Sequence, residues 1–128
     1  MAAERNVIAV LDDDPALRLA LGDLLSLSGY RTELYASAEE FITAAKTTEA
    51  SCLVVDIQLG EVSGVELGRQ LSRAGFTFPI VFMTGSQDEG FRRQAMDLGC
   101  VAYSHKPFPK ARLIEAIKMA IGSGHEAK

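Results

Sequence analysis

Short apolar runs alternate with helix-like segments along the chain, and this alternation constrains the fold more than any other feature. The strand-like runs cover about residues 6–11, 30–35, 52–56, 79–84 and 101–104. The segments with helical periodicity cover about residues 15–28, 37–46, 64–73, 88–98 and 110–121. Strands that alternate with helices form a parallel sheet, and right-handed crossovers lay the helices on both of its faces. The sequence therefore predicts an α/β fold of the (βα)5 type with a five-stranded parallel sheet.

The strand sequences predict the order of that sheet. Residues 30–35 alternate polar and apolar side chains, which is typical of an edge strand with one wet face. Residues 6–11 and 52–56 are largely apolar, as in strands buried on both faces. This pattern favours the doubly wound, flavodoxin-like order 2-1-3-4-5. We expect one domain over residues 1–121, followed by a flexible tail over residues 122–128.

Composition excludes several classes of protein. A hydrophobic content of 48% and a charged fraction of 23% are those of a globular domain. The apolar runs are far shorter than the roughly 18 residues that span a membrane, so we expect no membrane association. Two cysteines without a disulfide framework are expected to be buried reduced thiols, which fits a cytoplasmic location best. A net charge of −4 argues against nucleic-acid binding, which needs clustered Lys and Arg. The two cysteines have no metal-ligand spacing.

Chemically informative residues follow the strand-like runs. Asp12, Asp13 and Asp14 follow the first run, Asp56 and Thr84 end the third and fourth, and Lys106 comes soon after the fifth. Open α/β sheets bind their ligands at this carboxyl edge. Two carboxylates about 4 Å apart repel by roughly 4 kcal/mol at an effective dielectric of 20. We therefore expect a cation, or a reaction, to use this cluster.

The cluster has the parts needed for phosphoryl transfer to an aspartate. Asp12, Asp13 and Asp56 offer the carboxylates that Mg²⁺ (or Mn²⁺) prefers. A carboxylate can also act as a nucleophile and form an aspartyl phosphate. Lys106 would supply a fixed cation, and the Thr84 hydroxyl and the Gly85 backbone N–H would supply hydrogen-bond donors.

Four motifs in this order resemble the receiver domain of two-component response regulators, of the FixJ type. They are Leu11-Asp12-Asp13-Asp14, Asp56 with Gly64 eight residues later, Thr84-Gly85, and Lys106-Pro107-Phe108. The resemblance covers about residues 6–121. It implies that Asp56 is the phosphoacceptor and that Asp12, Asp13 and the Gln58 backbone carbonyl hold the metal. It also implies that Thr84 and Lys106 bind the phosphoryl group, and that the Tyr103 rotamer follows activation.

The same resemblance implies the partners. A histidine kinase or a histidine phosphotransfer protein would donate the phosphoryl group, and phosphorylation could produce a homodimer. We expect the donor to dock on the rim around Asp56, where Leu17, Pro107 and Phe108 are the apolar candidates. The chain would catalyse only its own phosphorylation and dephosphorylation, so it is expected to be a signalling switch and not a metabolic enzyme. One departure is Gly60, which stands where this family commonly has proline and predicts a more flexible loop.

Other interpretations use the same residues. A phosphohydrolase of the haloacid dehalogenase kind also forms an aspartyl phosphate, and Asp12-x-Asp14 superficially fits its first motif, but the chain has no room for a cap domain. A nucleotide binder on this fold needs a Gly-rich turn where Asp12 to Asp14 stand. A phosphate-independent adaptor would have no use for Thr84 and Lys106. Asp14 alone is also explained as a helix cap, and Tyr103 as an ordinary edge-strand aromatic.

Overall fold

The structure is a computed structural model that describes residues 6–85, 89–106 and 109–126. Its strands are β1 (Val7–Leu11), β2 (Arg31–Tyr35), β3 (Ala50–Asp56), β4 (Ile80–Thr84) and β5 (Ala102–His105). Its helices are α1 (Pro15–Leu27), α2 (Ala38–Ala44), α3 (Gly64–Arg73), α4 (Glu89–Asp97) and α5 (Lys110–Glu126). All strand pairs are parallel, in the order β2-β1-β3-β4-β5. The predicted fold class and strand order are therefore confirmed.

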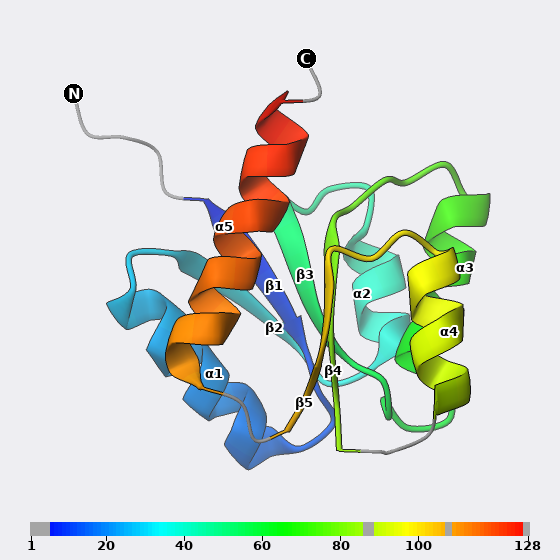
Figure 1. Cartoon of the computed structure of the whole chain (residues 1–128), viewed down its shortest axis with the longest axis horizontal. Coiled ribbons are helices and arrows are strands. Elements are labelled where there is room, and N and C mark those ends of the chain that lie inside the picture. Colours follow the sequence, from blue (N-terminus) through cyan, green and yellow to red (C-terminus); the bar gives the residue numbers. More distant parts are fainter. Residues whose placement is uncertain (1–5, 86–88, 107–108, 127–128) are drawn as a thin grey trace.

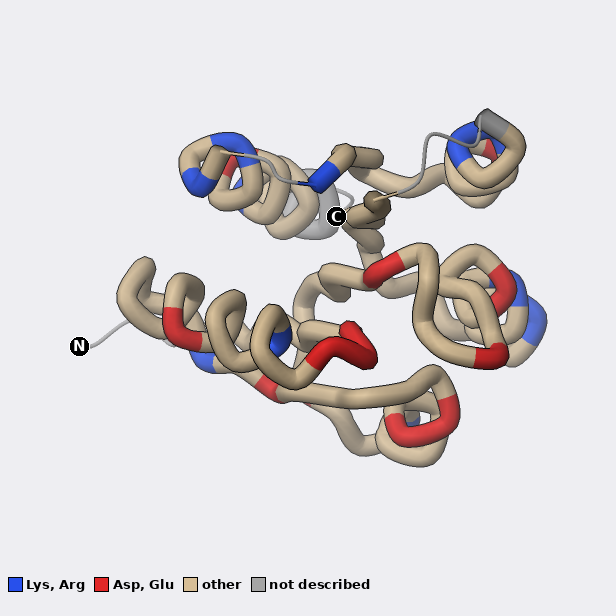
Figure 2. The backbone as a smooth tube through the Cα atoms, turned by 90° about the horizontal axis from the view of Figure 1, so that it is seen from below, with Lys and Arg blue, Asp and Glu red and all other residues tan. Residues whose placement is uncertain are grey.

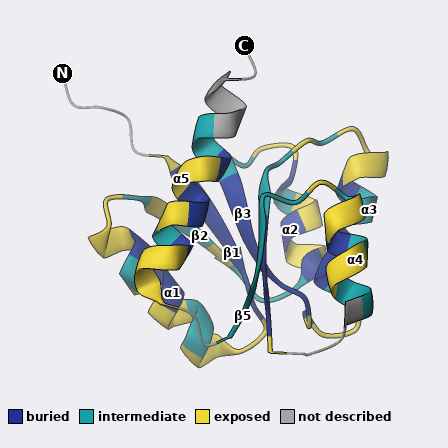
Figure 3. Cartoon of the chain, in the orientation of Figure 1, coloured by how far each residue is buried: buried dark blue, intermediate teal, exposed yellow. Residues whose placement is uncertain are grey.

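The sheet separates two apolar layers. Helices α1 and α5 cover one face, and α2, α3 and α4 cover the other (Figure 1). Successive residues of a strand point to opposite faces, so Ile8 and Val10 pack under α1 and α5 while Ala9 and Leu11 pack under the other helices. Full burial of a large apolar side chain contributes roughly 1.5–3 kcal/mol, which makes these layers the main source of stability. Figure 3 shows β1 and most of β3 buried and the outer helix faces exposed.

The edge position of β2 follows from its sequence. Its five residues are half-buried or exposed, whereas every residue of β1 is buried. The edge position is confirmed, but the expected single wet face is wrong. Tyr35 packs against the core on the α2–α4 side, and Leu34, from the opposite face of the strand, lies against Gly22 of α1.

Most element ends lie within two residues of the predicted bounds, which is ordinary variation at frayed termini. The end of α5 is the exception: the helix continues to Glu126, and the end expected at Ile121 is wrong. Gly122 is helical and is not among the described glycines with positive φ, so it does not stop the helix. A glycine in a helix costs about 1 kcal/mol relative to alanine, which weakens a helix without ending it.

Within the described ranges of the chain, no helix combines the length and the apolarity needed to cross a membrane.

Candidate functional site

The strand ends bring the singled-out residues to one edge of the sheet. Asp12 follows β1, Asp56 ends β3, Thr84 ends β4 and Lys106 follows β5. A backbone hydrogen bond holds the ends of β4 and β5 side by side: the Lys106 N–H donates to the Thr84 carbonyl at 2.7 Å. Figure 2 views the molecule toward this edge, where acidic segments gather near the middle.

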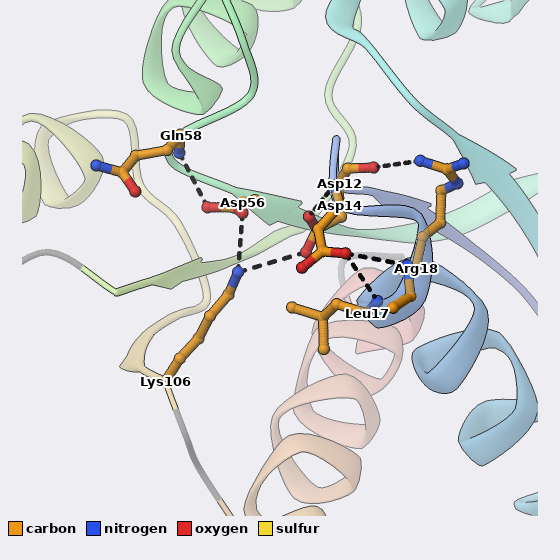
Figure 4. A network of polar contacts seen from close by, with 8 residues as sticks. Asp12, Asp14, Leu17, Arg18, Asp56, Gln58 and Lys106 are labelled. Atoms are coloured by element: carbon orange, nitrogen blue, oxygen red, sulfur yellow. Dashed lines mark hydrogen bonds and ion pairs between the residues drawn. The ribbon is translucent and has the colours of Figure 1, made fainter.

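Asp56 is almost completely buried, with 5% of its surface exposed. Its Oδ1 accepts a hydrogen bond from the Gln58 backbone N–H at 2.9 Å. Its Oδ2 is 2.8 Å from the Lys106 Nζ, which donates to it (Figure 4). The two oxygens are therefore oriented by groups on different loops.

Asp12 is fully buried and lies beside Asp56. Its Oδ1 accepts from the Asp14 N–H at 2.9 Å, and its Oδ2 is 3.4 Å from the Lys106 Nζ (Figure 4). Burial raises the pKa of the Asp12 carboxyl above its ordinary value, and the charge of Asp56 acts in the same direction against the Asp14 N–H and Lys106. The site thus disfavours the ionised form of Asp12, and a bound cation would stabilise that form.

Lys106 joins the two buried carboxylates. Partial burial by itself lowers the pKa of the ammonium group, but the hydrogen bonds and charges of Asp56 and Asp12 outweigh it, and the net pKa is raised. Lys106 is therefore a permanent cation at the site, able to meet a further anionic group.

Three carboxylates are placed to share a metal ion. Oxygens of Asp12, Asp13 and Asp56 lie within 4.8 Å of one another. Asp13 is exposed, so the cluster opens to solvent on one side. Hard oxygen ligands around one opening suit Mg²⁺ or Mn²⁺, and the residues present fit such an ion. A ligand role for the Gln58 carbonyl stays a prediction.

Asp14 belongs to the helix and not to this carboxylate group. Its Oδ1 accepts from the Ala16 and Leu17 N–H groups at 3.0 and 3.4 Å, which is N-cap geometry for α1. The interpretation of Asp14 as a helix cap is confirmed.

The loop after Asp56 depends on two glycines. Gly60 has φ +90°, a conformation that proline, fixed near −65°, cannot adopt. A Cβ at Gly64 would lie 2.6 Å from the Asp56 carbonyl oxygen, so only glycine lets α3 start this close to β3. A cavity of about 320 Å³ lies between this loop and the start of α2, and Asp13 lines it.

The remaining candidate residues occupy different positions. Thr84 is fully buried, and Gly85 beside it is exposed. Tyr103 is half-buried in β5 and packs against the core on the α2–α4 side. Leu17 is half-buried and packs against the α1–α5 side, while Pro107 and Phe108 lie outside the described residues.

Sequence reasoning missed Arg18. Its Nη1 donates to the Asp12 backbone carbonyl at 2.8 Å and so fixes the loop that carries Asp12 and Asp13 (Figure 4). The only signal in the sequence is its spacing of four residues from the cap Asp14, which places it on the first turns of α1.

Comparison with known proteins defines the class. The family model of the response regulator receiver domain matches residues 8–118, so the chain belongs to this family. It is 34% identical over 121 residues to the response regulator protein TodT of Pseudomonas putida, covering 94% of this chain and 53% of TodT. It is 34% identical over 119 residues to the transcriptional regulatory protein FixJ of Azorhizobium caulinodans, covering 93% and 56%. The chain spans about half the length of these relatives.

Solved structures agree with this assignment. The crystal structure of FixJ-N superposes with a TM-score of 0.87 at 31% identity, covering 94% of this chain and 96% of that one. A CheY-like receiver domain from Methanospirillum hungatei JF-1 has a TM-score of 0.90 at 23% identity, covering 98% and 100%, and shows the same fold. The chain is a receiver domain of two-component signalling.

Proposed function

We propose that this receiver domain accepts a phosphoryl group on Asp56 from a histidine kinase or histidine phosphotransfer protein, in a Mg²⁺-dependent reaction. The observation that carries the proposal is the position of Asp56, whose Oδ2 is 2.8 Å from Lys106 and whose carboxylate lies beside those of Asp12 and Asp13. A nucleophile, a cation and a metal-type ligand set thus meet at one sheet edge.

The residues would divide the chemistry as follows. A carboxylate oxygen of Asp56 attacks phosphorus, an O–P bond forms, and the N–P bond to the donor imidazole breaks. The Gln58 N–H orients the carboxylate, and Lys106 meets the negative charge on the transferred group. Mg²⁺, held by Asp12, Asp13, Asp56 and the Gln58 carbonyl, would neutralise phosphoryl charge when bound. The chain turns over no separate metabolite.

The phosphoryl group would then act as a switch ligand. The Thr84 hydroxyl, the Gly85 N–H and Lys106 are its binding groups, and Tyr103 responds to the movement of Thr84. Hydrogen bonds to a charged group contribute about 1.5–3 kcal/mol each. Reversing a 1:99 population needs around 5.5 kcal/mol, so more than one of these contacts is required.

We further infer that the donor docks on the rim that includes Leu17, Pro107 and Phe108, and that the reaction takes place in the cytoplasm. The output is control of a partner or of an effector domain, and a homodimer would form on phosphorylation. This chain is not expected to bind nucleic acid itself, because its net charge of −4 would oppose contacts with phosphate groups.

Intact-mass measurement with acetyl phosphate tests the proposal. The wild type should gain one phosphoryl group with Mg²⁺ present and none in EDTA, because the metal offsets the charge of three carboxylates. Asp13→Ala should not be labelled even with Mg²⁺ present, because it lacks one of the metal ligands. Asp23 is an exposed aspartate on α1, and Asp23→Ala should be labelled as the wild type is. A phosphate-independent adaptor would show no labelling under any of these conditions, and that result would overturn the proposal.

A further inference from the structure

Arg92 occupies a distinctive position on α4. The apolar side of this helix, with Phe91 and Ala95, packs on the core cluster beneath it. Arg92 is exposed on the flank that faces β5, and its guanidinium carbon lies 5.9 Å from the centroid of the Tyr103 ring. The neighbouring Arg93 is also exposed, which provides a matched reference for Arg92.

The Tyr103 ring is turned toward the interior beneath this cation. The ring packs against the core on the α2–α4 side, and its hydroxyl oxygen is buried. Tyr103 and His105 are two residues apart on β5 and therefore share a face of the sheet. The His105 ring meets the Tyr103 ring edge-on, with centroids 5.9 Å apart and an interplanar angle of 83°.

We propose that Arg92 is a positioning residue that holds the Tyr103 ring in its inward orientation and so ties α4 to β5. A cation over the face of a tyrosine is attracted by the ring quadrupole, and rotation of the ring toward solvent would break this contact. An exposed cation–π contact is strong enough to change the ratio of inward to outward ring by roughly two- to five-fold. The consequence for signalling rests on the proposed function, because it assumes that Tyr103 reports on phosphorylation.

The helix has a separate attachment on its other side. The Arg69 Nη2 of α3 donates to the Gln94 Oε1 of α4 at 3.1 Å. Removal of the Arg92 charge should therefore release the Tyr103 ring without detaching α4 from α3. This separation makes a local effect on Tyr103 distinguishable from a loss of the helix.

Fluorine NMR of the unphosphorylated chain labelled with 3-fluorotyrosine tests the proposal. The chain has three tyrosines, so the Tyr103 resonance is identified by its absence in Tyr103→Phe. Broadening by a soluble gadolinium chelate then measures how often the ring reaches solvent. Arg92→Met keeps the apolar stem and removes the charge, Arg92→Lys keeps a charge, and Arg93→Met is the matched control.

Arg92→Met should increase the outward population of Tyr103 by roughly two- to five-fold. Arg92→Lys should restore most of the wild-type value, and Arg93→Met should not change it. Equal accessibility in wild type and Arg92→Met, or an equal change in Arg93→Met, would overturn the role of Arg92. Because this readout needs no phosphoryl group, failure of acetyl phosphate to label the wild type would contradict the proposed function and leave the Arg92 result standing.

Discussion

At the scale of the residue, Asp12 shows how a side chain that destabilises the folded domain can favour the binding of a cation. The carboxyl is fully buried and lies beside Asp56, with only part of its charge offset by Lys106. Two carboxylates within 4.8 Å repel by more than about 3 kcal/mol at an effective dielectric of 20. The folded domain therefore retains electrostatic repulsion that a bound cation would relieve.

The raised pKa of Asp12 gives this repulsion a pH dependence. The native state keeps the Asp12 proton to a higher pH than the unfolded chain, whose aspartates titrate near 3.8. The contribution of Asp12 to the free energy of unfolding therefore falls as pH rises from about 4 through the raised pKa, and its destabilising effect is complete above that pKa.

Asp12→Asn should accordingly stabilise the metal-free protein by on the order of 1 kcal/mol at neutral pH. The amide oxygen can still accept from the Asp14 N–H, so the loop keeps its hydrogen bond. Urea unfolding in EDTA at a series of pH values measures the difference, which should vanish below about pH 4. Asp23→Asn removes an exposed charge and is the control; a destabilised Asp12→Asn protein at neutral pH would contradict the argument.

At the scale of the element, α5 tests how far helical structure extends. Gly122 is half-buried within the helix, and a Cβ built there meets no atom within 4 Å. Gly122→Ala should therefore raise the free energy of unfolding by about 0.5–1 kcal/mol, because alanine loses less conformational entropy in a helix. Chemical denaturation measures this gain. A destabilised variant would show that α5 ends near Ile121, as the sequence suggested.

The switch would use the pairing of β4 with β5. Thr84 pairs in register with His105, and Phe82 pairs with Tyr103, so the residue at the end of β4 lies one pair away from Tyr103 along the ladder. Thr84→Ala should still accept a phosphoryl group but lose about 1.5–3 kcal/mol of coupling to the switched state. Comparing NMR spectra of the phosphorylated wild type and variant measures this loss, and an unchanged conformational response would exclude Thr84 from the switch.

At the scale of the whole molecule, donor docking and core packing can be separated on α1. Leu17→Ala should slow phosphotransfer from a histidine protein that phosphorylates the wild type, while labelling by acetyl phosphate stays nearly normal, since a small donor makes no use of the rim. Leu24→Ala is the matched control, because Leu24 is half-buried and packs against the same core cluster. Equal slowing by both donors, or by both variants, would attribute the effect to lost packing.

The strand order could be predicted from the sequence, because the burial of a strand determines its pattern of apolar and polar residues. Apolar β1 and β3 had to be central, and alternating β2 had to lie at an edge. The start of β3 at Ala50 was missed, because Ala50 pairs with Val7, Ser51 falls at the register shift that follows, and the two residues form no apolar run. Contacts that depend on a long side chain folding back, such as Arg18 on the Asp12 carbonyl, leave no periodic signal.

The same reasoning explains what the sequence could say about the site. Asp56 and Lys106 are fifty residues apart, and only the parallel topology brings their side chains to 2.8 Å. Once the strand order is known, the carboxyl edge follows, and so does the cluster of Asp12, Asp13 and Asp56. The Arg92–Tyr103 contact depends on the position of α4 relative to β5, which periodicity does not determine.

Intact mass of wild type and Asp56→Asn, incubated side by side with acetyl phosphate and Mg²⁺, tests the central claim most directly. Asparagine nearly preserves the shape of the side chain and keeps an oxygen that can accept from the Gln58 N–H, but it removes the nucleophile. The account predicts one added phosphoryl group on the wild type and none on Asp56→Asn. An equally stable phosphoryl adduct on both proteins would contradict the assignment of Asp56 as the phosphoacceptor.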